Sequence, residues 1–221
     1  MKVCTDACLF GAVVADKIYR EQNNVSNLLD IGAGTGLLSL LVAQKTTATI
    51  DSVEIDEAAF EQAGQNFDNA PWGERLTILN IDVLDYISEK KYDCIISNPP
   101  FFEGDLKSDN TKKNAAKHDT TLTLEQLLGV IDQHLAPKGY FAILLPYQRV
   151  DYFITIAAAA NYGLQEQLLI RHTESHPFFR GILFFSLAAT ETITHQLSIK
   201  DPTGNYSPEF KHLLKDYYLQ F

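Results

Sequence analysis

Three features are scarce in this chain of 221 residues: cysteine, basic charge and long apolar runs. With 18 Lys and Arg against 28 Asp and Glu, the formal net charge is −10 and the pI is about 5.0. A strongly acidic protein is a poor general binder of nucleic acid, because the phosphate backbone is itself negative. Any nucleic-acid partner therefore requires a local cluster of basic residues.

The cysteines Cys4, Cys8 and Cys94 form an odd set that implies no disulfide framework. The C-x3-C spacing of the first two lacks a second pair of ligands, so we expect no zinc site and no other metal. Cys94 lies inside an apolar run and is expected to be a small buried side chain.

No segment approaches the roughly 18 uninterrupted apolar residues that a membrane-spanning helix needs. The N-terminal stretch MKVCTDACLFGAVVAD has Asp6 before a short apolar run and Asp16 after it, which makes a poor secretion signal. We therefore predict a cytoplasmic protein without membrane contact. Contents of 46% hydrophobic and 21% charged residues are typical of a globular protein, and this length suits one domain.

What the chain does contain is a regular alternation of short apolar runs and amphipathic segments. Strands are predicted over residues 26–31, 48–55, 75–81, 92–97, 139–146, 164–172 and 181–189. Helices are predicted over residues 35–45, 56–70, 83–90, 123–135 and 149–162, and in a C-terminal tail opened by Ser207-Pro208. No internal repeat or low-complexity tract interrupts this order.

The alternation predicts a Rossmann-like α/β fold, in which a mostly parallel sheet of seven strands is covered by helices on both faces. Only a loop separates the last two strands, so we expect them to pair as an antiparallel hairpin. We predict a single domain over residues 1–221, with an N-terminal element (1–24), a core (25–190) and a C-terminal extension (191–221).

The first predicted strand runs into DIGAGTG, which places Asp30, Gly32, Gly34 and Gly36 at the carboxyl edge of the sheet. Glycines at alternate positions let a ligand approach the backbone closely at the edge where parallel sheets bind ligands. The G-x-G-x-G spacing is one residue shorter than the dinucleotide fingerprint. Asp30 would also repel a pyrophosphate, whereas it suits a cation such as the ammonium of an amino acid.

Two further acids follow the next two strands. Glu54 comes 18 residues after Gly36, where a carboxylate can accept both hydroxyls of a ribose. Asp82 can accept from the exocyclic amine of an adenine, and the adjoining Ile55 and Val83 are assigned to the same site. Together these residues describe S-adenosylmethionine. The alternative is a tight glycine turn beside solvated loop acids.

With these residues the chain resembles the class I S-adenosylmethionine-dependent methyltransferases over about residues 27 to 189. The resemblance includes their antiparallel seventh strand.

The fourth predicted strand stops at Asn98-Pro99-Pro100-Phe101, where two prolines remove two backbone donors and stiffen the chain. This stretch resembles the [DNS]-P-P-[YFW] motif of amino-methyltransferases. On that resemblance, the Asn98 oxygen and the Pro99 carbonyl bind the two N–H groups of a planar amine, and Phe101 stacks on its base. A strand-ending turn with a core phenylalanine is the alternative.

Three further segments of the sequence indicate which family of amino-methyltransferases the chain resembles. MKVCTDACLFGA, NPPFFEGDLKSDNTKKNAAKHDTTLTLEQLL and NYSPEFKHLLKDYYLQF are similar to the bacterial valine-tRNA adenine-N6 methyltransferase family, so that the resemblance spans nearly the whole chain. It implies methylation of the adenosine 3′ of the anticodon in a valine tRNA. That base lies in a loop, and extruding it costs less than flipping one from a duplex.

The chain departs from this family at its start. Relatives usually carry a segment before the KV-TD element, whereas Met1 begins within it, so contacts made by that segment are missing or the true start lies earlier. By resemblance, Thr5 and Asp6 lie near the cofactor or target pocket. Alternatively, they form an N-cap pair that opens a helix.

Basic residues gather in two places, where local potential can hold phosphates despite the net charge. Arg171, His172, His176 and Arg180 flank the sixth and seventh strands. The other group follows Phe101 and comprises Lys107, Lys112, Lys113, Lys117 and His118. We assign the four lysines and Arg180 to tRNA binding, with a solvated lysine-rich loop as the alternative. Phe178 and Phe179 either sandwich the target base or belong to the core. We expect a monomer or a weak dimer.

Three other functions remain open. A ribosomal-RNA guanine-N2 methyltransferase shares N-P-P-F, but usually as N-P-P-F-H with a long N-terminal domain, whereas this chain has Phe102. A protein-glutamine methyltransferase typically shows N-P-P-Y and an added helical domain. The third is an inactive fold kept as an RNA-binding or cofactor-sensing module, which the intact glycine loop and the complete motif argue against. The DPTGNYSP segment is either a partner-docking element or a cover for the sheet.

Overall fold

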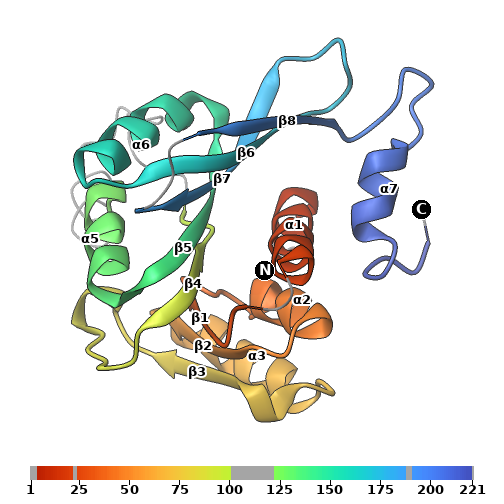
Figure 1. Ribbon diagram of the computed structural model, residues 1–221. Helices are drawn as coiled ribbons and strands as arrows, with labels where there is room; N and C mark the ends of the chain where they lie inside the picture. Colours follow the sequence, from red (N-terminus) through yellow and green to blue (C-terminus); the bar gives the residue numbers. More distant parts are fainter. Residues whose placement is uncertain (1–3, 22–23, 101–121, 188–190, 221) are drawn as a thin grey trace, which may run out of the picture.

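The computed structural model describes residues 4–21, 24–100, 122–187 and 191–220 (Figure 1). Within them, the strands form one sheet in the order β3-β2-β1-β4-β5-β7-β6-β8. The strands are β1 (Asn27–Ile31), β2 (Thr49–Glu54), β3 (Leu76–Asn80), β4 (Tyr92–Ser97), β5 (Leu135–Pro146), β6 (Gly163–Arg171), β7 (Phe178–Ser186) and β8 (Ile193–Ser198). The helices are α1 (Thr5–Arg20), α2 (Leu37–Lys45), α3 (Glu57–Asp68), α5 (Leu124–His134), α6 (Tyr147–Ala159) and α7 (Pro208–Leu214), with 3-10 turns η1 (Gly73–Arg75) and η2 (Val83–Asp85).

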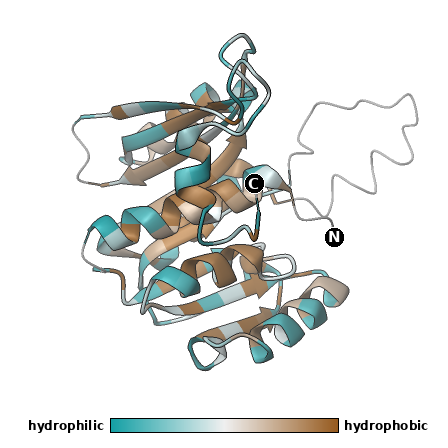
Figure 2. Ribbon diagram, turned by 90° about the vertical axis from the view of Figure 1, so that its right-hand side faces the viewer, coloured by the Kyte–Doolittle hydropathy of each residue, from teal (hydrophilic) through white to brown (hydrophobic). Residues whose placement is uncertain are grey.

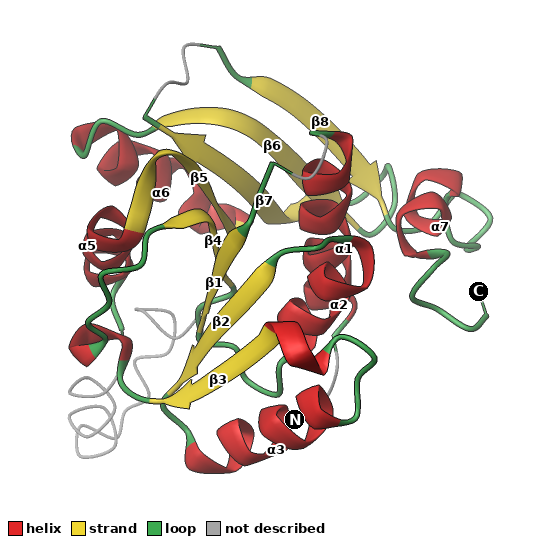
Figure 3. Ribbon diagram, turned by 60° about the horizontal axis from the view of Figure 1, so that its bottom comes forward, coloured by secondary structure: helices red, strands yellow, loops and turns green. Residues whose placement is uncertain are grey.

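The pairing confirms the predicted α/β fold. Strands β1 to β5 run parallel, and β7 is antiparallel to both β5 and β6. The predicted number of seven strands is wrong, because β8 adds an eighth strand parallel to β6. Of its six residues, four are exposed and only Leu197 is buried, so this edge strand lacks the apolar run that would reveal it in the sequence. Figure 3 shows the strands as one continuous twisted sheet.

Two apolar layers cover the sheet. On one face, α1 and α2 pack against β1, β4 and β5, with Phe10 and Phe184 at the centre of this layer. On the other face, α5 and α6 pack around Phe141, whose ring stacks on that of Phe185 with centroids 5.0 Å apart. In Figure 2 the strands are largely brown between helices whose outward faces are teal. None of the described helices is long and apolar enough to cross a bilayer.

Local chemistry sets where several helices begin. The Asp56 carboxylate accepts from the Ala59 N–H at 2.8 Å and caps α3, as the sequence predicts. Thr123 and Gln126 form a reciprocal capping box at α5. The predicted helix over residues 83–90 is wrong, because the structure has only the single turn η2 there. Tyr86 leaves that turn for the core, where its hydroxyl lies 2.6 Å from that of Tyr92.

Candidate active site

The candidate site lies where β1, β2, β3 and β4 end together. Ile31 pairs with Val53 on one side and with Ser97 on the other, and Glu54 pairs with Asn80. The segments that follow these strands therefore leave the sheet at one edge. The chain order also reverses at β1, which has β2 and β3 on one side and β4 and β5 on the other. Open α/β sheets bind their ligands at such a switch point.

The glycine loop needs its glycines for two different reasons. Gly32, Gly34 and Gly36 have φ values of 72°, 58° and 80°, in the left-handed region that favours glycine. A Cβ on Gly36 would lie 2.4 Å from Cε1 of Phe67, so close packing excludes a side chain there. At Gly32 nothing lies within 4 Å of the same position. Gly32 therefore borders open space in which a ligand can reach the backbone.

Asp30 is a fully buried carboxylate with one oxygen that has no partner. The Ser39 hydroxyl donates to Asp30 Oδ2 at 2.7 Å, and the hydroxyl oxygens of Ser39 and Ser52 are 2.9 Å apart. Asp30 Oδ1 has no hydrogen-bond partner in the described part of the chain. Burial raises the pKa of Asp30 to about 7, opposed by the Ser39 hydrogen bonds and reinforced by the charge of Glu54. The free oxygen is suited to a cationic donor.

Glu54 holds two segments of the site together. Its Oε2 accepts from the Gly34 N–H at 2.7 Å, and its Oε1 accepts from the Asp56 N–H at 2.9 Å. Each carboxylate oxygen keeps further acceptor capacity, so hydroxyl groups of a ligand can still bind. The side chain of Ile55 beside it is 60% exposed, which offers an apolar surface at the mouth of the site.

Asp82 and Val83 follow β3. The Asp82 carboxylate accepts from the Leu84 N–H at 2.9 Å and caps η2, while Val83 is buried. Asp82 is half-buried, and a carboxylate has more acceptor sites than this one bond uses, so it too remains able to accept.

Asn98 comes directly after β4. Its Oδ1 is buried and has no hydrogen-bond partner among the described residues. The Ser97 hydroxyl before it donates to the Ile31 carbonyl at 2.9 Å, which fixes the end of β4 against the end of β1. Pro99 is buried and Pro100 is exposed. Phe101, Lys107, Lys112, Lys113, Lys117 and His118 lie outside the described residues.

Comparison with known proteins identifies the family. The sequence profile of the methyltransferase small domain matches residues 12–145. The chain is 43% identical to the tRNA1(Val) (adenine(37)-N6)-methyltransferase of Dyadobacter fermentans over 226 residues, which cover 100% of this chain and 92% of that protein. A protein of the same name from Pectobacterium carotovorum is 37% identical, covering 99% of this chain and 88% of its own. The chain belongs to this methyltransferase family.

Solved structures confirm the class I methyltransferase fold. A predicted O-methyltransferase from Agrobacterium tumefaciens has a TM-score of 0.71 at 18% identity, covering 95% of both chains. The glycopeptide N-methyltransferase MtfA in complex with S-adenosylmethionine has a TM-score of 0.59 at 11% identity, covering 80% of this chain and 94% of that one. At these identities the likeness concerns the fold alone.

In this methyltransferase, Arg180 lies at the same edge of the sheet as Asn98. It pairs in register with Pro146, the last residue of β5, which neighbours β4. Arg180 Nε donates to Asp6 Oδ2 at 2.8 Å, which ties β7 to the first turn of α1. Burial opposes ionisation of Asp6, but hydrogen bonds from Cys4 and Arg180 outweigh it and lower the pKa of Asp6. Thr5 and Asp6 are the first two residues of α1, at the edge of the site. The alternative that they form an N-cap pair is wrong, because the N-cap is Cys4, with no side-chain capping bond.

Phe178 and Phe179 are both half-buried. Phe179 packs partly against the core on the α1 side, whereas Phe178 lies beside Tyr147, with ring centroids 5.6 Å apart. Two supporting contacts of the site have no local signal in the sequence. Ser39 of α2 donates to Asp30 of β1, and Arg180 donates to Asp6 across 174 positions of the chain.

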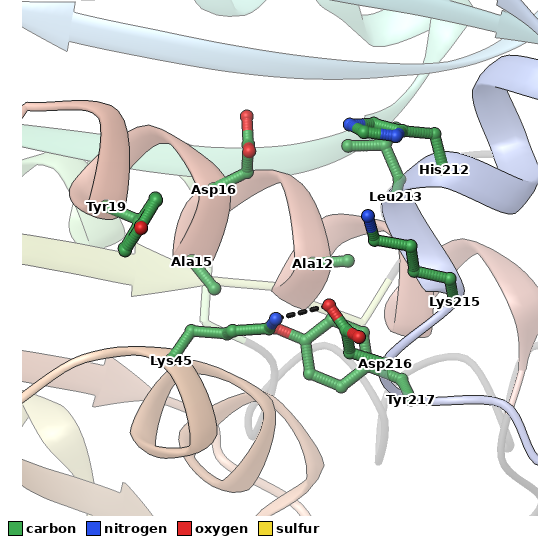
Figure 4. Close-up of a pocket in the computed structure, with 10 residues that line it drawn as sticks. All are labelled: Ala12, Ala15, Asp16, Tyr19, Lys45, His212, Leu213, Lys215, Asp216 and Tyr217. Carbon is green, nitrogen blue, oxygen red and sulfur yellow. Dashed lines mark hydrogen bonds and ion pairs between the residues drawn. The ribbon is translucent and has the colours of Figure 1, made fainter.

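A cavity of about 270 Å³ lies between α1, the end of α2 and the C-terminal segment (Figure 4). Lys45, Lys215 and Asp216 are among the residues that line it, and Lys45 forms an ion pair with Asp216. Lys45 ends α2, whereas the glycine loop precedes its first residue. This cavity is therefore separate from the candidate active site.

Proposed function

We propose that the protein transfers a methyl group from S-adenosylmethionine to the exocyclic N6 of the adenosine 3′ of the anticodon in a valine tRNA. The names of its relatives support this substrate. The structural observation that carries the proposal is the buried, unpartnered Oδ1 of Asn98 beside the glycine loop. A buried acceptor without a donor costs stability, so its presence is best explained by a ligand that supplies the N–H group. We further propose that the protein acts in the cytoplasm as a monomer or a weak dimer.

The residues around the glycine loop fit this cofactor. Asp30 Oδ1 would accept from the ammonium of its amino-acid arm, and the open space before Gly32 would admit that arm. Glu54 would accept from the ribose hydroxyls, and Asp82 from the adenine amine. Ile55 and Val83 would contact the adenine ring, with Gly34 and Gly36 holding the loop. When bound, S-adenosylmethionine supplies an electrophilic methyl group on its sulfonium sulfur.

The chemistry required of the protein is orientation of a weak nucleophile. The lone pair of an adenine N6 is delocalised into the ring. Asn98 Oδ1 and the Pro99 carbonyl would accept its two N–H groups, which favours a pyramidal nitrogen whose lone pair faces the methyl group. In the transfer, N6 would form a bond to the methyl carbon as the bond from that carbon to sulfur breaks, and N6 would then lose one proton to water. Acceptors that bind this geometry better than the planar ground state accelerate the transfer.

We assign binding of the tRNA to five basic residues and Phe101. We propose that Arg180 binds a phosphate near the target adenosine from its position beside the end of β5. Phe101 would stack on the target base, and Lys107, Lys112, Lys113 and Lys117 would contact the backbone.

The test is methyl transfer from labelled S-adenosylmethionine to total tRNA from cells that lack the native enzyme, followed by nucleoside analysis. We expect labelled N6-methyladenosine confined to valine tRNA. A labelled guanosine product would assign the chain to guanine-N2 methyltransferases instead, and no labelled nucleoside despite cofactor binding would refute the proposal.

The variant Asn98→Ala tests the proposed role of the motif. We expect kcat to fall by at least about 100-fold, as for loss of one transition-state hydrogen bond, while the affinity for S-adenosylmethionine stays unchanged. Asn69→Ala, at an exposed position at the end of α3, is the matched control and should keep full activity.

A further inference from the structure

A β-bulge shapes the start of β7, at the same edge of the sheet as Asn98. Ile170 of β6 pairs with Arg180, but Arg171 pairs with Phe178, so Phe179 is one extra residue on β7. Bulges of this kind re-aim side chains and are common beside active sites. Here the bulge brings Phe178 and Phe179 into contact with different partners at the β6–β7 turn.

The first contact is a stack of His172 on Phe179. Their ring centroids are 4.3 Å apart and the planes differ by 3°. The Arg180 guanidinium lies 5.5 Å from the Phe179 centroid. Phe179 is half-buried, whereas His172 is exposed. His172 is therefore an exposed ring that stacks on Phe179, with His176 edge-on to it at a centroid distance of 6.0 Å.

Two basic residues flank His172 along the backbone. The Arg171 guanidinium is 5.4 Å from the Phe178 centroid, and its Nε donates to the Ser198 hydroxyl at 3.0 Å. The backbone N–H of Lys200 donates to the His172 carbonyl at 2.8 Å, and its ammonium lies 5.9 Å from the Tyr206 ring centroid. Among the described residues, neither Arg171 nor Lys200 forms an ion pair with a carboxylate. Both charges remain available to an anionic partner.

We propose that this surface, formed by Arg171, His172, Phe179 and Lys200, binds a nucleotide of the anticodon loop other than the target adenosine. The base stacks on His172, and the adjoining phosphates contact Arg171 and Lys200. This inference rests on the proposed tRNA substrate. An exposed ring with basic residues near it is the combination that single-stranded nucleic acid requires, and it stands out on a chain with a net charge of −10.

The position of the surface agrees with such a contact. The strands β4, β5, β7 and β6 follow one another along the sheet, and neighbouring strands are about 4.8 Å apart. His172 therefore lies about 14 Å across the strands from Asn98. Ser97 is in line with Ile143, Leu183 and Gln167, so His172 also lies four residues, or about 13 Å, further out along the strand direction, which makes about 20 Å in all. Extrusion of the target base unstacks other bases of the loop, and they need a new stacking partner.

Binding of an unmodified valine tRNA transcript tests the stack. We expect the Kd of His172→Ala to rise by about 5-fold or more, the effect of losing one base–aromatic stack. His172→Phe keeps a flat ring and should bind within about twofold of the wild type. His195→Ala is the matched control, since His195 is exposed on β8 and lies 3.6 Å from Glu166 rather than near the turn. All variants should bind S-adenosylmethionine like the wild type.

The dependence of tRNA binding on salt concentration tests the proposed phosphate contacts of Arg171 and Lys200. Arg171→Gln and Lys200→Gln should each flatten the dependence of log Kd on log salt by about 0.7, the value for one phosphate of a single strand. Lys211→Gln on α7 should leave the slope unchanged. Wild-type binding by His172→Ala, or equal weakening in His172→Ala and His172→Phe, would overturn the stacking role. Unchanged slopes would overturn the phosphate contacts.

This inference and the proposed function fail in different ways. If the wild type methylates adenosine in valine tRNA but the turn variants bind normally, only the surface is wrong. If the wild type neither binds nor methylates tRNA, the substrate itself is wrong, and the inference falls with it.

Discussion

Replacement of Asp30 by Asn separates the stability of the fold from binding of the cofactor. Asp30 is completely buried, and burial raises its pKa from 3.8 to about 7. Above that pKa the folded protein holds a buried charge with one unpartnered oxygen. We therefore expect Asp30→Asn to be more stable than the wild type above neutral pH when no cofactor is present, and to bind S-adenosylmethionine more weakly.

The magnitude follows from proton linkage. Because the folded pKa of this acid lies above the unfolded one, the folded state binds more protons between the two values, and stability falls as pH rises through that window. A tenfold change in proton affinity corresponds to about 1.4 kcal/mol, so the full cost of ionising Asp30 is about 4 kcal/mol. About half of it, roughly 2 kcal/mol, develops between about pH 5.5 and pH 8. The new amide leaves one buried donor unpaired at a cost of about 1–3 kcal/mol.

Urea unfolding of the two proteins at these two pH values measures the effect. The difference in unfolding free energy between Asp30→Asn and the wild type should grow by about 2 kcal/mol in favour of the variant from about pH 5.5 to pH 8. A difference that does not change with pH would refute the reasoning, since it would mean that Asp30 keeps the same charge throughout. Titration calorimetry should show weaker cofactor binding by the variant at the higher pH.

Three further predictions concern the loop and the Asp6–Arg180 pair. Gly36→Ala should lower the unfolding free energy by about 2 kcal/mol or more, because its Cβ would meet Phe67 at 2.4 Å; a melting curve like that of the wild type would contradict this. Gly32→Ala should cost only the strain of its positive φ, about 1–2 kcal/mol, yet weaken cofactor binding, because its Cβ would project into open space. A double-mutant cycle of Asp6→Asn and Arg180→Gln by urea unfolding should give a coupling of about 1 kcal/mol or more at neutral pH. That coupling should be lost as pH falls through the lowered pKa of Asp6. The exposed Lys45–Asp216 ion pair is the control, and its coupling should be small.

The sequence predicts the parallel part of this fold well because its signals are local. Each of the first five strands is a short apolar run, and Asp56 marks the start of α3 by its own side chain. Parallel pairing then requires that the ends of β1 to β4 meet. For this reason Asp30, Glu54, Asp82 and Asn98 are placed at one edge without any knowledge of their contacts.

The remainder depends on contacts that no local pattern encodes. Strand β8 is a strand because β6 supplies its partners, since four of its six residues are exposed. The turn η2 is short because Tyr86 enters the core. Glu54 has the spacing of a ribose ligand, but only the structure shows that it also holds Gly34 and Asp56. The bulge at Phe179 is likewise invisible in FFRGILFFS, whose apolar run suggests an unbroken strand.

The long separation of the contacts made by α1 and α2 has a consequence for synthesis. Arg180 lies 174 positions after its partner Asp6 in the chain. Tyr217, whose hydroxyl donates to the Leu41 carbonyl, lies 176 positions after Leu41. At the usual rate of translation, about 5–20 residues per second, this delay is roughly 10–35 s. During that time α1 and α2 can pack on each other, but the later segments that also contact them, β7 and α7, have not yet been made. The first helix to be made thus completes its contacts only when translation is nearly finished.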